Sequence, residues 1–192
     1  MTATPIPRTF QMCLGGLKDL SVIETPPSDR LAIHTLVAKM SDSLIAEAIE
    51  HEIARGGQVY FLHNRVEQLP EYYERIHRLV PKARIVIAHG QMDEKALEAA
   101  MFSFIHHEVD VLLCTTIIES GIDIPSANCL IVSQAERFGL AQLYQIRGRV
   151  GRSSERAYCY LLTSRDELSD IARERLNAIE RLTELGSGLE IA

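Results

Sequence analysis

Short apolar runs alternate with amphipathic stretches along most of this chain. The runs are rich in β-branched residues and span 58–63, 83–88, 109–115, 129–132 and 157–162. Their apolar residues are continuous, which is typical of strands covered on both faces of a sheet. Alternation of such strands with helices predicts an α/β fold with a parallel sheet flanked by helices.

Three amphipathic stretches separate these strands. They cover 44–53, 69–80 and 97–105, and their apolar stripes are Leu44, Ile45, Ala48, Ile49 and Ile53, then Leu69, Tyr73, Ile76 and Val80, then Leu97, Met101, Phe104 and Ile105. The first is predicted to stop at Gly56-Gly57, and the third to begin at Asp93-Glu94. We expect all three stripes to face the core.

The two ends of the chain differ from its middle. Ser164-Arg165-Asp166-Glu167 has the pattern of a capping box and predicts a long helix whose apolar residues are Leu168, Ile171, Leu176, Ile179 and Leu182. The chain stops soon after Gly186 and Gly188, and it opens on the proline-rich turn Thr4-Pro5-Ile6-Pro7. An abrupt start and stop indicate a fragment of a longer protein.

Composition narrows the class of protein. The 192 residues suffice for one sizeable α/β domain with a smaller appendage, and no apolar run reaches the roughly 20 residues that span a bilayer. The four cysteines form no CxxC pair, which predicts reduced thiols in a cytoplasmic protein. The net charge of −6 argues against a free-standing nucleic-acid-binding domain. His106-His107 is interpreted as a helix end, because no second cluster of metal ligands accompanies it.

The strongest motif is Gln145-Ile146-Arg147-Gly148-Arg149-Val150-Gly151-Arg152. Its glycines let the backbone turn tightly around three arginines. Arginine holds phosphate in a bidentate geometry, so the motif predicts a phosphate site. A solvated Arg/Gly loop is the alternative from spacing alone.

A second motif follows the apolar run at 109–115. It begins with Thr115-Thr116 and ends with Gly121-Ile122-Asp123-Ile124-Pro125. Hydroxyl groups at the carboxyl end of a parallel strand lie where α/β folds bind ligands. Asp123 is a candidate acceptor for a sugar hydroxyl, although Gly-x-Asp also occurs in ordinary turns.

Together the two motifs resemble motifs V and VI of superfamily 2 helicases, and the QxxGRxGR pattern is specific to that superfamily. Thr2-Ala3-Thr4 is similar to motif III, 58–64 occupies the place of motif IV, and His89-Gly90-Gln91-Met92 is similar to a strand-end loop that touches DNA. The resemblance implies a RecA-like sheet, the second of a pair of motor domains.

Longer segments narrow the resemblance to two families of double-stranded DNA translocases. Residues 2–9 (TATPIPRT) and 137–153 (RFGLAQLYQIRGRVGRS) resemble both the bacterial transcription-repair coupling factors and the fork-reversing, branch-migrating helicases. Residues 20–27 (LSVIETPP), 56–67 and 121–125 (GIDIP) look closer to the coupling factors. The resemblance covers essentially the whole chain.

The family assigns roles to the residues that match its motifs. It implies that Arg149 and Arg152 reach the γ-phosphate of ATP from across a cleft, with Gln145 nearby as a third catalytic residue. It implies that Gly121 and Asp123 bind the nucleotide at its ribose.

Residues Asn64, His89, Gly90, Thr115 and Thr116 would then contact double-stranded DNA. Thr2 and Thr4 would couple the ATP state to the grip on DNA. RNA polymerase and excision-repair proteins are further partners that the family implies, through regions outside this chain.

The departures from the family pattern are absences. The sequence contains no GxxxxGK[ST] and no DExH-type acidic box. ATP with Mg²⁺ would therefore bind mainly to a first domain that this chain lacks, and we expect the chain alone to be inactive. The expected division is 1–27 as the tail of that first domain and a linker, 28–163 as the second RecA-like domain, and 164–192 as the start of a helical translocation hairpin.

Two alternatives stay open at this point. A fork-reversing helicase shares the chemistry and differs in its DNA substrate. A stand-alone module that binds an anion or a partner through the arginine loop is the second, from another class. No feature demands self-association, so we expect a monomer.

Overall fold

A computed structural model describes residues 33–115, 127–151, 155–164 and 167–181. Within these ranges six parallel strands form one sheet in the order β1-β6-β5-β2-β4-β3. The strands are β1 (His34–Lys39), β2 (Gln58–Leu62), β3 (Ile85–Ala88), β4 (Val111–Cys114), β5 (Ala127–Ser133) and β6 (Tyr158–Thr163). The predicted parallel α/β sheet is confirmed.

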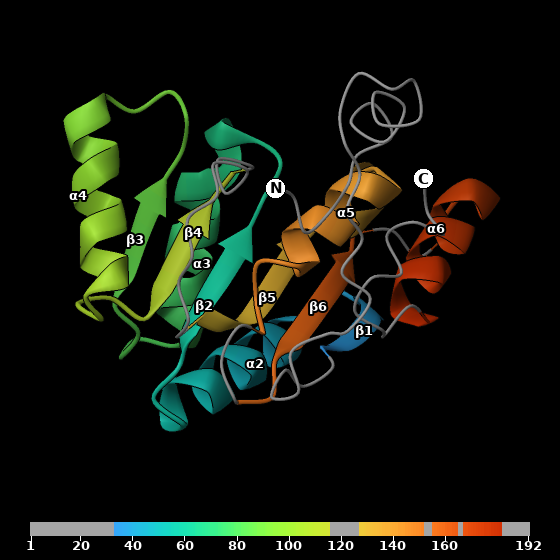
Figure 1. The fold of residues 1–192 in the computed structure, drawn as a ribbon, viewed down its shortest axis with the longest axis horizontal. Coiled ribbons are helices and arrows are strands. Elements are labelled where there is room, and N and C mark those ends of the chain that lie inside the picture. The colour runs from blue at the N-terminus through green and yellow to red at the C-terminus, as the bar shows by residue number, and fades with distance from the viewer. Residues whose placement is uncertain (1–32, 116–126, 152–154, 165–166, 182–192) are drawn as a thin grey trace, which may run out of the picture.

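Helices cover both faces of the sheet. They are α2 (Asp42–Ala54), α3 (Leu69–Leu79), α4 (Glu94–Ile105), α5 (Leu140–Arg147) and α6 (Asp170–Arg181), with short 3₁₀ turns η1 (Val66–Gln68) and η3 (Ala135–Arg137). Helices α2 and α3 pack on one face, and α4, α5 and α6 pack on the other. Figure 1 shows β3 and α4 at one edge of the sheet and β1 with α6 toward the other.

Five of the six strands lie where the apolar runs predicted them. Strand β1 was missed, because its sequence HTLVAK is too polar to form a continuous apolar run. It pairs in parallel with β6, from His34 opposite Tyr158 to Lys39 opposite Thr163. As an edge strand β1 has a neighbour on one side only, which explains its weaker sequence signal.

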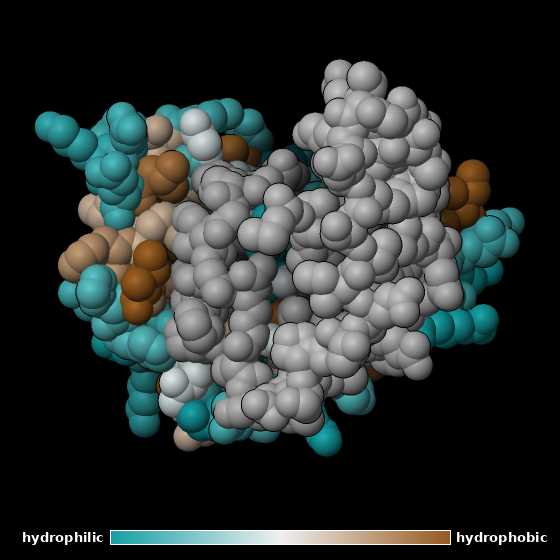
Figure 2. Space-filling view, in the orientation of Figure 1, coloured by the Kyte–Doolittle hydropathy of each residue, from teal (hydrophilic) through white to brown (hydrophobic). Residues whose placement is uncertain are grey.

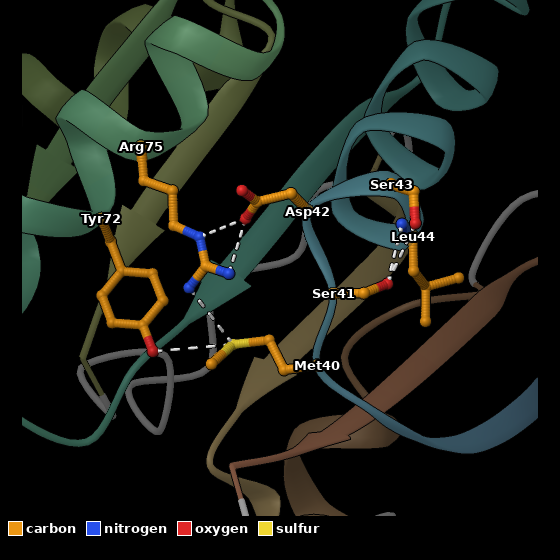
Figure 3. A network of polar contacts seen from close by, with 7 residues as sticks. All are labelled: Met40, Ser41, Asp42, Ser43, Leu44, Tyr72 and Arg75. Atoms are coloured by element: carbon orange, nitrogen blue, oxygen red, sulfur yellow. Dashed lines mark hydrogen bonds and ion pairs between the residues drawn. The ribbon is translucent and has the colours of Figure 1, made fainter.

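The helix boundaries follow from local chemistry. Ser41 caps α2 by accepting a hydrogen bond from Leu44 N, and Gly56 follows the helix with φ of 76°. Asp93 caps α4 through Ala96 N, and His106 and His107 terminate it as expected. Figure 3 shows α2 joined to α3, where Arg75 forms an ion pair with Asp42 at 2.6 Å.

In the same contact the sulfur of Met40 accepts hydrogen bonds from the Tyr72 hydroxyl at 3.7 Å and from the Arg75 guanidinium at 3.8 Å. These bonds connect the residue after β1 to α3. The carboxyl end of the edge strand is thereby attached to the neighbouring helix.

Several sequence-based expectations are wrong in detail. Helix α6 begins at Asp170 with Ser169 as its cap, whereas the predicted capping box began at Ser164, whose hydroxyl bonds to Glu136 instead. Ile105 is 46% exposed, although it was assigned to a core-facing stripe, and Ile171 of the predicted C-terminal helix is 76% exposed. Figure 2 shows hydrophobic surface on the sides where α4 and α6 lie.

The remaining core assignments hold with one shift. In α3 the buried aromatic side chain is Tyr72, while the predicted Tyr73 is only half-buried. Cys114, Cys129 and Cys159 are buried free thiols, as expected, and burial raises the pKa of Cys159 to about 12. Among the helices in the described ranges, none combines the length and the apolar character needed to cross a bilayer.

Candidate functional site

The carboxyl ends of the parallel strands meet at one edge of the sheet. Backbone hydrogen bonds extend beyond the strands there: His63 N donates to Cys114 O at 2.9 Å, and Thr115 N donates to Ala88 O at 3.3 Å. The residues that follow β2, β4 and β3 are therefore held side by side. In α/β folds this edge is the usual place for ligands.

Three of the predicted DNA-contact positions lie on this edge. Asn64 follows β2, Thr115 follows β4, and His89 follows β3 and precedes the exposed Gly90. Thr115 is buried, whereas Asn64 and His89 are half-buried. Asn64 Oδ1 and His89 Nδ1 are buried atoms without a hydrogen-bond partner. Such atoms cost about 1–3 kcal/mol each, so they mark positions that are not optimised for stability.

A buried histidine that sequence reasoning missed supports this edge. His63 Nδ1 lies 2.7 Å from Ser133 Oγ, and its Nε2 lies 2.7 Å from Gln68 Oε1. The Ser133 hydroxyl is also 3.1 Å from Leu62 O, to which it donates. Burial lowers the pKa of His63, and the hydrogen bond to Gln68 opposes this effect only in part. His63 is thus a neutral side chain that ties the ends of β2 and β5 together.

Helix α5 carries the arginine motif. Gln145 lies within the helix and is half-buried. Arg149 is half-buried just past the helix, and its backbone N donates to Ile146 O at 3.0 Å. Gly151 has φ of 73°, and a Cβ there would lie 3.0 Å from the Ile33 side chain and 3.1 Å from that of Ala157. This close approach explains why the motif needs glycine at its second turn.

Arg147, the first arginine of the motif, is buried instead of facing solvent. Its Nη1 donates to Ile179 O of α6 at 2.7 Å, and its guanidinium lies 5.1 Å from the ring centre of Tyr144. Burial lowers its pKa. Arg147 follows Leu140 and Leu143 at helical spacing, which places it on the buried side of α5. Sequence analysis considered Arg147 only as part of the arginine motif and missed this spacing. The positive charge of Arg147 is accordingly not at the surface.

Several predicted site residues lie outside the described ranges. These are Thr2, Thr4, Thr116, Gly121, Asp123 and Arg152. Among the residues that are described, no cluster of three or more His, Cys, Asp or Glu side chains is placed to hold a metal ion. The described part of the site thus consists of arginines, amides, hydroxyls and imidazoles.

The model of the helicase conserved C-terminal domain matches residues 40–154, which contain the strand-end positions and the whole arginine motif. The chain belongs to the helicase C-terminal domain family. The fold agrees with this assignment, because a parallel sheet with helices on both faces is common to the solved structures that this domain resembles.

Close relatives are transcription-repair coupling factors. This helicase C-terminal domain is 57% identical over 193 aligned residues to the coupling factor of Myxococcus xanthus and 55% identical to that of Bacillus subtilis strain 168. Each alignment covers 100% of this chain and 16% of the relative. The chain therefore spans about one sixth of the length of these curated relatives.

Solved structures extend the comparison. The structure of RecG bound to a three-way DNA junction superimposes with a TM-score of 0.83 at 35% identity, covering 100% of this chain and 26% of that one. The structure of Saccharomyces cerevisiae Dbp5 L327V bound to RNA and ADP BeF₃ gives a TM-score of 0.67 at 14% identity, covering 99% and 52%. At that identity the second likeness concerns the fold alone.

Proposed function

We propose that this helicase C-terminal domain is the second RecA-like motor domain of an ATP-dependent double-stranded DNA translocase that acts in transcription-repair coupling. The observation that carries the proposal is 53–57% identity to transcription-repair coupling factors over the full length of the chain. Identity at this level over the whole chain favours a shared role. The chain would contribute one half of a motor whose other half binds most of the nucleotide.

In this proposal Arg149 and Arg152 contact the γ-phosphate of ATP from across the interdomain cleft, with Gln145 beside them. Gly121 and Asp123 bind at the ribose, and Mg²⁺ is held mainly by the first domain. Arg149 is half-buried just past the end of α5, and its backbone bond to Ile146 O fixes the start of its side chain, which supports this assignment. The two arginines lose their anionic partner on hydrolysis, which lets the domains part.

The grip on DNA is assigned to Asn64, His89, Gly90, Thr115 and Thr116. Of these residues, Asn64, His89 and Thr115 have polar side chains at the carboxyl edge. Uncharged groups of this kind bind phosphates without reading bases, as a translocase requires. Thr2 and Thr4 would couple nucleotide state to this grip.

Helix α6 belongs to the proposed helical extension that starts near residue 164. The bond from Arg147 to Ile179 O supports a role for this helix in transmitting movement, since it joins α6 to the helix that precedes Arg149. RNA polymerase, excision-repair proteins, a cytoplasmic location and a monomeric state complete the proposal for the parent protein.

The test is DNA-stimulated ATP hydrolysis by the longer protein that includes the first domain. Arg152→Ala and Arg149→Ala should each lower kcat by about a thousandfold or more, since arginine fingers contribute roughly 10³–10⁵. The matched control is Arg78→Ala, on the exposed side of α3, which should leave kcat unchanged. The 192-residue chain alone should hydrolyse no ATP.

Near-normal turnover of Arg152→Ala would contradict the arginine-finger assignment and point to a DNA or partner contact instead. DNA-stimulated turnover by the chain alone would sink the half-motor proposal.

A fork-reversing helicase is the second candidate, favoured by the TM-score of 0.83 to RecG. Identity is lower there, at 35% against 57% for the Myxococcus coupling factor. Displacement of a stalled RNA polymerase by the parent protein supports the coupling role, and reversal of a model fork without polymerase displacement supports the other.

A further inference from the structure

Gln134 ends β5 in an unusual backbone conformation. Its φ of 52° and ψ of 46° lie in the left-handed region, which glycine and asparagine adopt far more readily than glutamine. It is one of two non-glycine residues with positive φ in the described ranges, and the other, His107, lies at an ordinary helix end. Strain of this kind gathers at functional sites.

The side chain of Gln134 is also unsatisfied. Its amide oxygen is buried and has no hydrogen-bond partner, although the residue as a whole is half-buried. Left-handed backbone and an unmet buried amide both destabilise the folded chain. Neither contributes to folding, so their coincidence at one residue indicates a role in binding.

Asn64 follows β2, the strand beside β5 in the sheet. Strands β2 and β5 pair in register, with Leu62 opposite Val132, and the next pair, His63 and Ser133, is joined by the 2.7 Å side-chain hydrogen bond. Asn64 follows His63 and Gln134 follows Ser133, so both residues lie just beyond this bonded pair in the sequence. Each has a buried amide oxygen without a partner.

The strand order places these amides in a row of polar groups. Across β5, β2, β4 and β3, the residues at the carboxyl edge are Gln134, Asn64, Thr115 and His89. With neighbouring strands about 4.8 Å apart, the row is roughly 14 Å long, close to the rise of four nucleotides of one DNA strand. The row does not continue to the next strand, β6. Ser164, the residue after β6, donates hydrogen bonds to the Glu136 carboxylate, whose negative charge would repel a phosphate.

We propose that the Gln134 carboxamide is a further contact of this domain with the DNA backbone, at the β5 end of the row. The proposal deepens the proposed function and rests on it. The amide oxygen is the buried atom, so the NH₂ group is the end of the carboxamide that donates to a phosphate oxygen.

Three substitutions in the parent protein separate backbone strain from amide chemistry. Gln134→Gly keeps the left-handed backbone at no cost and removes the amide, whereas Gln134→Asn keeps an amide and tolerates the conformation. Gln142→Ala is the matched control, because this glutamine is also half-buried but lies within α5, outside the row. The measurement is DNA-stimulated ATP hydrolysis against DNA concentration, together with thermal unfolding.

Gln134→Gly should raise the DNA concentration for half-maximal stimulation about tenfold, the effect of one hydrogen bond to a charged group. Its kcat at saturating DNA, its KM for ATP and its melting temperature should match or exceed those of the wild type. Gln134→Asn should lie within about threefold of the wild type for DNA, because its shorter amide retains part of the bond. Gln142→Ala should keep the wild-type half-saturation for DNA.

An unchanged half-saturation for DNA in Gln134→Gly would overturn the proposal. A raised KM for ATP with unchanged half-saturation for DNA would also overturn it, in favour of a contact with the first motor domain. Absence of DNA-stimulated hydrolysis in the wild type would count against the proposed function itself, which keeps the two failures distinct.

Discussion

Gln58 is the first residue of strand β2, and Asn64 lies just beyond the other end of the strand. The two side-chain amides differ in whether they have hydrogen-bond partners. Gln58 Nε2 donates to Phe104 O and to Val109 O, both at 2.7 Å. Asn64 Oδ1 is buried without a partner. The amino end of the strand uses its amide to hold β2 against the end of α4, and the carboxyl end leaves its amide unmet.

Charged groups show the same contrast. At the amino end Arg55 pairs with Glu52, donates to Arg156 O at 2.7 Å and lies 5.3 Å from the ring centre of Tyr158. Glu52 Oε1, like Thr35 Oγ1 near the start of β1, is buried without a partner. Burial raises the pKa of Glu52 despite the opposing effect of Arg55. At the carboxyl end the unmet atoms belong to Asn64, His89 and Gln134, which follow three separate strands.

The difference teaches which end of the sheet stabilises this fold. Most of the polar groups named at the amino end are bonded within the domain, which fixes the strand starts. At the carboxyl end His63 and Ser133 are bonded to each other, but Asn64, His89 and Gln134 each keep a buried atom without a partner, at the edge where α/β folds bind ligands. Four sets of substitutions test this division.

The largest effect is expected at Gln58. Gln58→Ala leaves the Phe104 and Val109 carbonyls without this donor, and should lower the free energy of unfolding by about 3 kcal/mol. Urea unfolding of the chain measures it, with Gln142→Ala as a half-buried glutamine control that stays within about 1 kcal/mol of the wild type. A loss at Gln58 no larger than at Gln134→Gly would break the comparison between the two ends.

The second effect is at Gly57, where the amino end is packed most tightly. A Cβ there would lie 2.7 Å from Cδ of Glu52, whose carboxylate is held by Arg55. Gly57→Ala should therefore destabilise by about 2 kcal/mol through overpacking. Gly56→Ala has open space around its Cβ and should cost about 1 kcal/mol, from its positive φ alone. Equal losses would show that Glu52 is not fixed.

The third effect is a pH dependence at the carboxyl end. Because burial lowers the pKa of His63 below its usual 6.5, the neutral ring stabilises the fold above pH 6.5, and this contribution is lost as pH falls through the folded pKa. Between pH 7.5 and 5.5 the wild type should lose about 1 kcal/mol that His63→Gln does not lose. His77→Gln, on the exposed side of α3, keeps His63 and should keep the wild-type dependence; equal slopes in His63→Gln would contradict the assignment.

The smallest effect is at a surface ion pair of the amino end. Arg84 and Asp110 form an ion pair at 2.7 Å. Burial alone would raise the pKa of Asp110, but the hydrogen bonds and the charge of Arg84 have the larger effect and lower it. The stabilisation from this ion pair is present above the ordinary pKa of aspartate and is lost as pH falls below about 4. Arg84→Ala should cost about 0.5 kcal/mol at neutral pH and nothing near pH 2, measured by thermal unfolding; a constant cost would exclude the ionic contribution.

Sequence patterns predicted those features that depend on neighbouring residues. The apolar runs located five strands, and Asp93 and Gly56 marked helix ends, because capping and turn geometry are local. The arginine motif was likewise found from local spacing, whereas the strand-end residues Asn64, His89 and Gly90 were assigned through the resemblance to helicase motifs. Sequence patterns failed where contacts with distant residues decide the outcome. Ile171 has helical spacing but is exposed, and Ser164 bonds to Glu136 instead of capping a helix.

By itself, then, the sequence determined a parallel α/β domain of the helicase type and the positions that bear its motifs. Only the tertiary structure decided that β1 completes the sheet beside β6, that Arg147 lies buried against Ile179, and that His63 bonds to Ser133. These relations join segments from 32 to more than 100 residues apart. No local pattern encodes such pairings, because they arise only when distant segments pack together and exclude water.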